Sequence, residues 1–333
     1  MLALFPGQGS QYVGMGKDLV QNFGVARQAF EEASDAIGVN LSKLCFEGPE
    51  SDLMLTENTQ PCLLAHSIAT FRVAVIETGV RTSRVAGHSL GEYSALVASG
   101  SLGLAQAAKL VRLRGQLMQK AVPAGEGTMA AILGLEDAQV TALCERATEV
   151  AISKQSGESS GLSVRTTVEP ANFNAPGQTV VAGSKNAVGE IPALLTTDAF
   201  KGGKCIPLSV SAPFHCSLMK PARDGLSSAF LKVSPDAQPK SPIFPYVPNR
   251  TARSTQEASV VFDLLMEQLD HPVLWTASMN HCLEQGHAKA IEFGPGRVLQ
   301  GLMKRIAKAA GQNIETVSIG DPAGIKSLEA FIK

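Results

Sequence analysis

The stretch that decides the fold reads RVAGHSLGEYSALVAS and spans residues 84–99. Residues 84–86 favour a short strand and residues 92–99 favour a helix, so the motif Gly-x-Ser-x-Gly lies on the turn between them. Small flanking residues let the strand and helix backbones pass closely, and such a sharp turn lifts the hydroxyl of Ser89 above a sheet edge. It also points the first helical N–H groups, including that of Leu90, to the place where an oxyanion would form. The stretch predicts a nucleophilic serine in an α/β protein; the simpler alternative is a glycine-rich turn without chemistry.

On either side of this turn, short apolar runs alternate with longer amphipathic stretches, a pattern typical of α/β proteins. Residues 2–5 favour a buried strand that runs into a glycine-rich turn. Residues 62–78 and 105–120 favour helices, and Pro61 suits the first turn of the earlier one.

After a Gly/Pro break at residues 122–127, the pattern changes to strand, helix, strand, strand, helix and strand. This order is that of the ferredoxin-like motif. The expected strands span residues 128–133, 170–174, 178–182 and 204–210, and the expected helices span residues 136–148 and 187–195. A surface loop is expected at 153–161, because this segment is polar and rich in Ser and Gly. The pattern predicts a large α/β domain at 1–126 and 210–333, interrupted by a small ferredoxin-like domain at 127–209.

Composition narrows the class of protein. Of 333 residues, 44% are hydrophobic and 18% are charged, an ordinary balance for a folded globular protein. The formal net charge of −1 argues against a nucleic-acid partner, which would call for a strong basic excess. The N-terminus lacks the basic region of a signal peptide, and no segment holds the roughly 18 apolar residues of a membrane span. The six cysteines are scattered without metal-ligand spacing, so we expect a cytoplasmic protein with reduced thiols, no metal and no membrane contact.

A serine nucleophile needs a base within hydrogen-bond reach, and the six histidines are the candidates. His66 lies in an apolar helix and is expected to be buried and satisfied. His88 is expected to be structural, because adjacent side chains on such a turn diverge. Three more histidines fall in polar contexts and are expected to be solvated: His271, His281 and His287. His215 differs, because it follows a predicted strand in a proline-containing loop, and loops at strand ends carry catalytic groups in open α/β sheets.

Short motifs follow one another along nearly the whole chain. In order they are FPGQGSQ at 5–11, NTQP at 58–61, GHSLGEY at 87–93, RGQLMQ at 114–119, NFN at 172–174, PFH at 213–215 and GPG at 294–296. This series resembles the malonyl-CoA:acyl-carrier-protein transacylases, and equally the acyltransferase domains of fatty-acid and polyketide synthases. The resemblance implies a hydrolase-like α/β core with a parallel sheet and an inserted ferredoxin-like α+β subdomain, which agrees with the organisation expected from the pattern alone.

The resemblance also implies a catalytic pair without a third, acidic member. Ser89 would attack the thioester of malonyl-CoA, and His215 would take its proton. The backbone N–H groups of Gln8 and Leu90 would form the oxyanion hole. Arg114, which taken alone would pass for a solvated charge on a helix, would hold the malonyl carboxylate. A guanidinium fits a carboxylate through two parallel N–H···O bonds that a lysine cannot reproduce.

Further positions follow from the same resemblance. Gln60 and Asn174 lie in motifs that would contribute to substrate binding. A main-chain carbonyl from the segment HPVLW at 271–275 would orient the imidazole of His215. Leu274 stands there in place of a glutamine found in some relatives, which is harmless if only the carbonyl matters.

The implied activity is a ping-pong transfer of a malonyl group from malonyl-CoA, a coenzyme A thioester, to the phosphopantetheine thiol of acyl carrier protein through a seryl ester. Phe214 resembles an aromatic residue that crowds an α-methyl branch and would select malonyl over methylmalonyl, unless it merely packs the loop. No bound cofactor is expected, and nothing in the sequence indicates a dimer helix, so we expect a monomer. Two alternatives stay open, an acyl-thioester hydrolase on the same scaffold and a catalytically silent docking protein. The sequence does not distinguish a fatty-acid from a polyketide pathway.

Overall fold

The computed structural model describes residues 1–155, 164–210, 212–233 and 238–333. The chain divides into two compact units. Unit 1 comprises Met1–Gln116, Ser228–Leu264 and Ala277–Lys333, and unit 2 comprises Leu117–Ser227 and Leu265–Thr276. The domain limits expected from the sequence, 1–126 with 210–333 and 127–209, remain a prediction.

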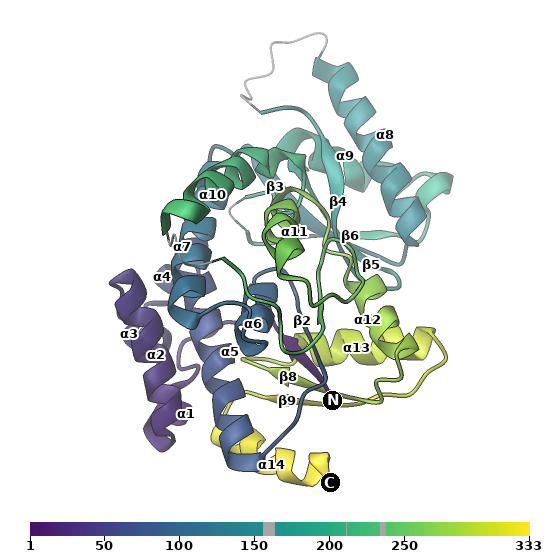
Figure 1. The fold of residues 1–333 in the computed structure, drawn as a ribbon. Coiled ribbons are helices and arrows are strands. Elements are labelled where there is room, and N and C mark those ends of the chain that lie inside the picture. The colour runs from purple at the N-terminus through teal and green to yellow at the C-terminus, as the bar shows by residue number, and fades with distance from the viewer. Residues whose placement is uncertain (156–163, 211, 234–237) are drawn as a thin grey trace. The chain divides into compact units, whose positions relative to one another are not determined.

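Unit 1 is built on a five-stranded parallel sheet in the order β7-β2-β1-β8-β9. Its strands β2, β8 and β9 are labelled in Figure 1. Its strands are β1 (Leu2–Phe5), β2 (Arg84–Gly87), β7 (Tyr246–Val247), β8 (Lys289–Phe293) and β9 (Glu315–Ile319). The central strand β1 is buried along its whole length, as the continuous apolar run predicts. Phe5 pairs with Gly87, so the segments that follow β1 and β2 begin at the same edge of the sheet.

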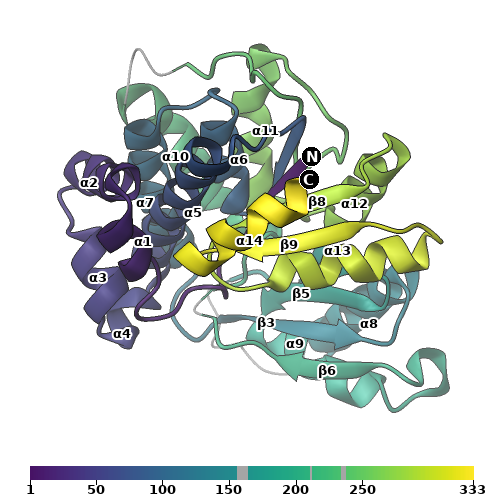
Figure 2. The ribbon, with the colours of Figure 1, turned by 90° about the horizontal axis from the view of Figure 1, so that it is seen from below.

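Helices surround this sheet within unit 1. They are α1 (Lys17–Asn22), α2 (Gly24–Ile37), α3 (Leu41–Glu47), α4 (Glu50–Leu53), α5 (Thr56–Thr78), α6 (Gly91–Ala98), α13 (Val298–Ala309) and α14 (Pro322–Ile332). α6 follows β2 and packs on both β1 and β2, while α13 and α14 both contact β9 (Figure 2). The predicted strand–turn–helix around Ser89 is therefore present as β2, turn and α6.

α5 begins earlier than the sequence predicts. It starts at Thr56 and contains Pro61 in its interior, so the placement of Pro61 in the first turn was wrong. The reason is packing against α7 (Leu104–Lys120). A Cβ atom on Gly115 of α7 would lie 2.6 Å from the Cα of Glu57, so the two helices approach closely at the first turn of α5. This contact supports a turn of helix that the proline alone disfavours.

Unit 2 contains a four-stranded antiparallel sheet in the order β4-β5-β3-β6. Its elements are β3 (Gly127–Leu133), α8 (Asp137–Gln155), β4 (Val168–Ala175), β5 (Gln178–Ser184), α9 (Lys185–Leu194) and β6 (Lys204–Pro207). Apolar side chains of both helices pack with those of the strands in one core, for example Leu143, Val181 and Ile191. The fold class predicted from the sequence, a parallel α/β core and an α+β subdomain of ferredoxin-like order, is confirmed.

The predicted loop at 153–161 needs one correction. Residues 153–155 belong to the end of α8, because that helix runs on to Gln155. Residues 156–161 lie outside the described part of the chain.

The unit boundaries fall within helices. These are α7, α10 (Lys220–Val233), α11 (Ala258–Asp270) and α12 (Trp275–Glu284). The described residues also form two short 3₁₀ turns, Asp198–Phe200 and Ser217–Met219. Among the helices of the described ranges, none has both the length and the apolar character needed to cross a bilayer.

Candidate active site

Ser89 lies on the turn between β2 and α6. Its φ of 52° is in the left-handed region, which is unfavourable for residues other than glycine. The two glycines of the motif are required by close backbone contacts. A Cβ atom on Gly87 would lie 1.9 Å from the carbonyl group of Gly91, and a Cβ atom on Gly91 would lie 2.0 Å from the carbonyl oxygen of Phe5. The strand and the helix pass at a separation that only glycine allows, and this fixes Ser89 at the end of β2.

A buried polar network supports this turn. The side-chain Oδ1 of Asn249 accepts a hydrogen bond from the N–H of Ser89 at 2.7 Å, and its Nδ2 donates to the carbonyl of Gly87 at 2.7 Å. The main-chain N–H of Asn249 donates to the carboxylate of Glu92 at 3.1 Å. Asn249 and Glu92 are both fully buried. Sequence reasoning missed Asn249, which is 160 positions away from Ser89. The only signal is its place just after the short strand β7, which pairs with β2.

Arg114 reaches the nucleophile from α7. Its Nη2 donates to the hydroxyl oxygen of Ser89 at 3.1 Å, and its Nη1 donates to Oε1 of Gln60 at 2.8 Å. The guanidinium also lies over the ring of Tyr93, with 5.7 Å from its central carbon to the ring centroid. The side chain is only 1% exposed, so the expectation of a solvated charge does not apply. Burial lowers the pKa of Arg114, while Tyr93 and Glu92 act in the opposite direction.

The two predicted oxyanion-hole residues follow neighbouring strands. Gln8 lies in the turn after β1, where its side-chain Nε2 donates to Oγ1 of Thr56 at 3.4 Å. Leu90 is the N-cap residue of α6, and its side chain is buried. Because Phe5 and Gly87 are paired, both residues lie near the same sheet edge as Ser89. Their role as oxyanion donors remains a prediction.

His215 belongs to unit 2 and also has a positive φ, of 59°. Its Nδ1 lies 2.8 Å from the carbonyl oxygen of Gln268, and its side chain is buried. Since a carbonyl oxygen only accepts hydrogen bonds, this contact places the proton on Nδ1 and leaves the lone pair on Nε2, as a general base requires. The neighbouring Phe214 is also buried. Sequence reasoning missed Gln268, because a main-chain carbonyl leaves no trace in the identity of its residue.

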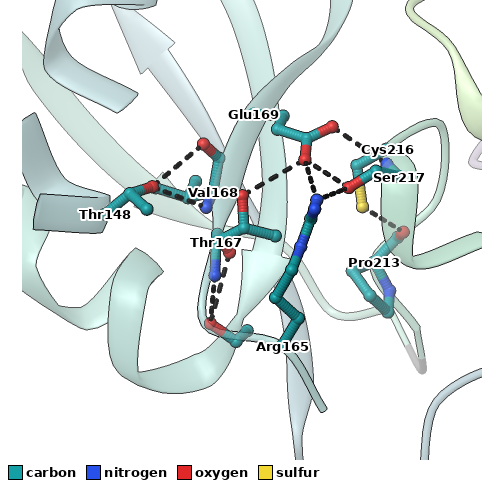
Figure 3. A network of polar contacts seen from close by, with 9 residues as sticks. Thr148, Arg165, Thr167, Val168, Glu169, Pro213, Cys216 and Ser217 are labelled. Carbon is teal, nitrogen blue, oxygen red and sulfur yellow. Dashed lines mark hydrogen bonds and ion pairs between the residues drawn. The ribbon is translucent and has the colours of Figure 1, made fainter. Parts of the chain in front are cut away.

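The turn that carries His215 is anchored by a polar network of unit 2 (Figure 3). The carboxylate of Glu169 accepts from the N–H of Ser217 at 2.9 Å and from the Ser217 hydroxyl. Arg165 donates to the same carboxylate at 3.2 Å and also to the hydroxyl of Ser217. On the other side of the turn, the thiol of Cys216 donates to the carbonyl of Pro213 at 3.1 Å. The network holds the backbone just after the imidazole.

The remaining predicted site residues also lie in unit 2. Asn174 is buried on β4, and Leu274 is partly buried. Main-chain bonds between Phe173 and Val273 and between Val273 and Ala171 fix the segment before Leu274 beside β4. The roles proposed for Asn174 and Leu274 remain predictions.

Two of the other histidines are deeply placed. His66 is fully buried, and burial lowers its pKa to about 4. His281 was expected to be solvated, and that prediction was wrong. Its Nε2 lies 3.0 Å from Nη1 of Arg84, and its Nδ1 lies 3.2 Å from Nη1 of Arg253. Contacts with residues so distant in the sequence are invisible to a local pattern. His271 and His287 are partly buried.

Comparison with known proteins defines the class. Residues 3–322 match the acyl transferase domain family, and the chain belongs to this family. The resemblance expected from the motifs, to malonyl-CoA:acyl-carrier-protein transacylases, is confirmed. One relative is the malonyl CoA-acyl carrier protein transacylase of Escherichia coli strain K12, which is 43% identical over 303 residues and is covered over 91% of each chain. The enzyme of the same name from Bacillus subtilis strain 168 is 39% identical over 323 residues, which are 97% of this chain and 94% of that protein.

Solved structures agree. An acyl carrier protein S-malonyltransferase from Vibrio cholerae superposes with a TM-score of 0.87 at 43% identity, covering 98% of this chain and 99% of that one. A second structure holds a malonyl-transacylase in complex with a type II PKS acyl-carrier protein. It matches with a TM-score of 0.86 at 41% identity, covering 99% of each chain.

Proposed function

We propose that this protein transfers a malonyl group from malonyl-CoA to the phosphopantetheine thiol of an acyl carrier protein, through an ester on Ser89. The observation that carries the proposal is the buried guanidinium of Arg114, which donates to the hydroxyl of Ser89 at 3.1 Å. A guanidinium fits a carboxylate through two parallel N–H···O bonds, and the free carboxylate of a malonyl group would lie beside the reacting thioester. The names of the relatives support the donor, and the carrier complex of one relative supports the acceptor.

In the first half-reaction, Oγ of Ser89 attacks the thioester carbonyl carbon, and its proton passes to Nε2 of His215. The negative charge on the former carbonyl oxygen is stabilised by the N–H groups of Gln8 and Leu90. The carbon–sulfur bond then breaks, and the departing CoA sulfur takes the proton from the imidazolium. Malonyl remains on Ser89 as an ester.

In the second half-reaction, His215 takes the proton of the carrier's thiol, and the sulfur attacks the ester carbonyl. The carbon–oxygen bond breaks, and Oγ of Ser89 recovers the proton from His215. One residue serves first as base and then as acid in each half, so the pair returns to its starting state. The Nδ1–H bond to the carbonyl of Gln268 supports this role, because it keeps the lone pair on Nε2.

Arg114 is suited to its role because it is already oriented. Gln60 accepts a hydrogen bond from Nη1, and the guanidinium lies over the ring of Tyr93. A preorganised guanidinium loses little freedom when the carboxylate arrives. Asn174 is proposed to contribute to the same binding of substrate, and Leu274 to the orientation of His215 through its main chain. Phe214 is proposed to disfavour methylmalonyl over malonyl by about 10-fold to 200-fold, the range for one extra methyl group.

A transfer assay with malonyl-CoA and holo acyl carrier protein tests the proposal. We expect malonyl carrier as the product, and we expect Ser89→Ala to abolish it. Free malonate without malonyl carrier would identify a thioester hydrolase and would refute the transfer. Undiminished transfer by Ser89→Ala would remove Ser89 from the mechanism.

The role of Arg114 is tested by comparing two donors, malonyl-CoA and acetyl-CoA. Arg114→Ala should reduce malonyl transfer by about 10²-fold to 10³-fold, because one partner of a buried ion pair is lost. Acetyl transfer should fall much less, since acetyl has no carboxylate. The matched control is Arg112→Ala on the same helix, where Nη1 bonds Oδ1 of Asn58 at 3.1 Å and no contact reaches Ser89. Equal losses for both acyl groups would exclude carboxylate binding by Arg114.

A further inference from the structure

The turn at Ser89 has to be held against its own backbone preference. A residue other than glycine is strained at φ 52°, and relaxation of the turn would carry Oγ away from its place. The contacts of Gly87 and Gly91 hold the strand and the helix close together, but they make no hydrogen bond to the backbone of Ser89. A group that bonds both ends of the turn is needed to select it.

Asn249 is that group. Its Oδ1 accepts from the N–H of Ser89 and its Nδ2 donates to the carbonyl of Gly87, each at 2.7 Å. One planar amide therefore spans the turn from Gly87 to Ser89. The two partners fix which end of the amide is oxygen and which is nitrogen. In a flipped amide, Nδ2 would face the N–H of Ser89 and Oδ1 would face the carbonyl of Gly87, and neither pair can form a hydrogen bond.

The amide is itself fixed by its surroundings. The main-chain N–H of Asn249 donates to Oε2 of Glu92 at 3.1 Å, and both side chains are fully buried. Register holds Asn249 in place, since Val85 pairs with Tyr246 and Ala86 pairs with Val247 in the preceding strand. Burial lowers the pKa of Arg114, and the charge of Glu92 acts against this shift, so the carboxylate that Asn249 bonds favours the charged guanidinium.

We propose that Asn249 is a positioning residue for the nucleophile: its side-chain amide fixes the turn at Ser89 and thereby the place of Oγ. This inference rests on the proposed function, in which Ser89 carries the acyl group. One consequence concerns the oxyanion hole. The N–H of Ser89 is bonded to Asn249, so the hole has to be built from other donors, which agrees with the assignment of Leu90 and Gln8.

The test is the rate of acylation of Ser89 by malonyl-CoA in a single turnover. In Asn249→Ala, both bonds to the turn are lost, and we expect the rate to fall by about 10²-fold, the loss typical of a displaced reacting group. The Kd of malonyl-CoA should stay within about threefold of the wild type, because Arg114 and Gln60 are untouched. The pH dependence of kcat/KM should keep its shape, since the base is unchanged. If Asn249 only stabilised the fold, its loss would not lower the acylation rate while leaving the Kd and the pH dependence unchanged.

The matched control is Ser101→Ala. The hydroxyl of Ser101 donates to the carbonyl of Lys240 at 2.7 Å, so the variant loses a long-range bond of the same unit without contact to the turn. It should lose stability and keep its rate. Asn249→Ser provides a milder second variant, because a hydroxyl makes one of the two bonds; we expect about tenfold loss of rate.

The outcomes distinguish the inference from the function on which it rests. If Ser89→Ala still forms acyl-enzyme, the proposed function itself fails. If Ser89→Ala is inactive but Asn249→Ala acylates as fast as Ser101→Ala, the function stands and the positioning role of Asn249 is refuted. Should Asn249→Ala fail to fold, wild-type acylation by a folded Asn249→Ser variant would equally refute it.

Discussion

The turns at Ser89 and His215 share a rare backbone conformation, with φ of 52° and 59°, but different surroundings hold them. At Ser89 the supports are close glycine contacts and the fully buried pair Asn249 and Glu92. At His215 the supports include Glu169 and Arg165, whose side chains are 32% and 66% exposed. The same backbone strain can therefore be held by packing or by partly solvated polar contacts. We expect substitutions at the supports of the Ser89 turn to have large effects, and substitutions at the supports of the His215 turn to have small effects.

Gly91→Ala should have the largest effect on stability, because it adds a methyl group inside the packed turn. The new methyl group would lie 2.0 Å from the carbonyl oxygen of Phe5, which cannot yield without moving the central strand β1. We expect the free energy of unfolding to fall by more than about 4 kcal/mol, or the protein to be recovered unfolded. Urea denaturation measures this. The matched control is Gly103→Ala, where nothing lies within 4 Å of the added atom, and a change within about 0.5 kcal/mol is expected. Similar values for both variants would contradict the packed turn.

The pH dependence of stability provides a second test of the unit that holds Ser89, because this unit also holds the fully buried His66. Burial lowers the pKa of His66 to about 4 from an ordinary value of 6.5. As the pH falls through this window, the unfolded chain binds a proton that the folded protein does not. Stability is therefore full above pH 6.5 and declines toward pH 4, by up to about 3 kcal/mol for this group.

His66→Gln removes this titration and should flatten the dependence of the unfolding midpoint on pH. A residual slope is expected from His287, whose pKa is also lowered to about 4, first by burial and then by Arg84. If the variant keeps the slope of the wild type, His66 is not the origin of the acid sensitivity.

Glu169→Ala should have the smallest effect, since it loosens the turn of His215 at a partly solvated site. The N–H and hydroxyl of Ser217 lose their acceptor, and Arg165 loses its ion pair. We expect kcat for malonyl transfer to fall by about tenfold, the order of one or two hydrogen bonds at partial exposure. Glu149→Ala is the matched control, because it removes an exposed ion pair of unit 2, with Arg146 at 2.9 Å, and should leave kcat unchanged. A loss of activity as large as that expected for Asn249→Ala would contradict the proposed difference between the supports of the two turns.

Much of this architecture could be predicted from the sequence where the cause is local. The turn at Ser89 was foreseeable because the chemistry needs glycine at both flanks, and the contacts of Gly87 and Gly91 give the reason. The ferredoxin-like order was foreseeable because each strand and helix carries its own periodicity. The approach of Arg114 to Ser89 required the family resemblance, since a lone arginine on a helix has no local sign of burial.

The features that the sequence does not predict depend on contacts between residues far apart in the chain. The start of α5 was misplaced, because packing of Gly115 against Glu57 outweighs the local preference of Pro61. The polar context of His281 predicts a solvated residue, whereas Arg84, 197 positions away, contacts its ring. Asn249 was missed for the same reason. A polar residue after a two-residue strand gains meaning only when the sheet order places that strand beside β2.

Mapping the site of acylation identifies the nucleophile directly. The protein is mixed with malonyl-CoA in the absence of carrier, quenched within one turnover, digested and mapped by mass spectrometry. We predict one malonyl group on the peptide that contains Ser89, and none on the corresponding peptide of Ser89→Ala. A malonyl group on another residue, or an equal yield of adduct in Ser89→Ala, would contradict Ser89 as the nucleophile.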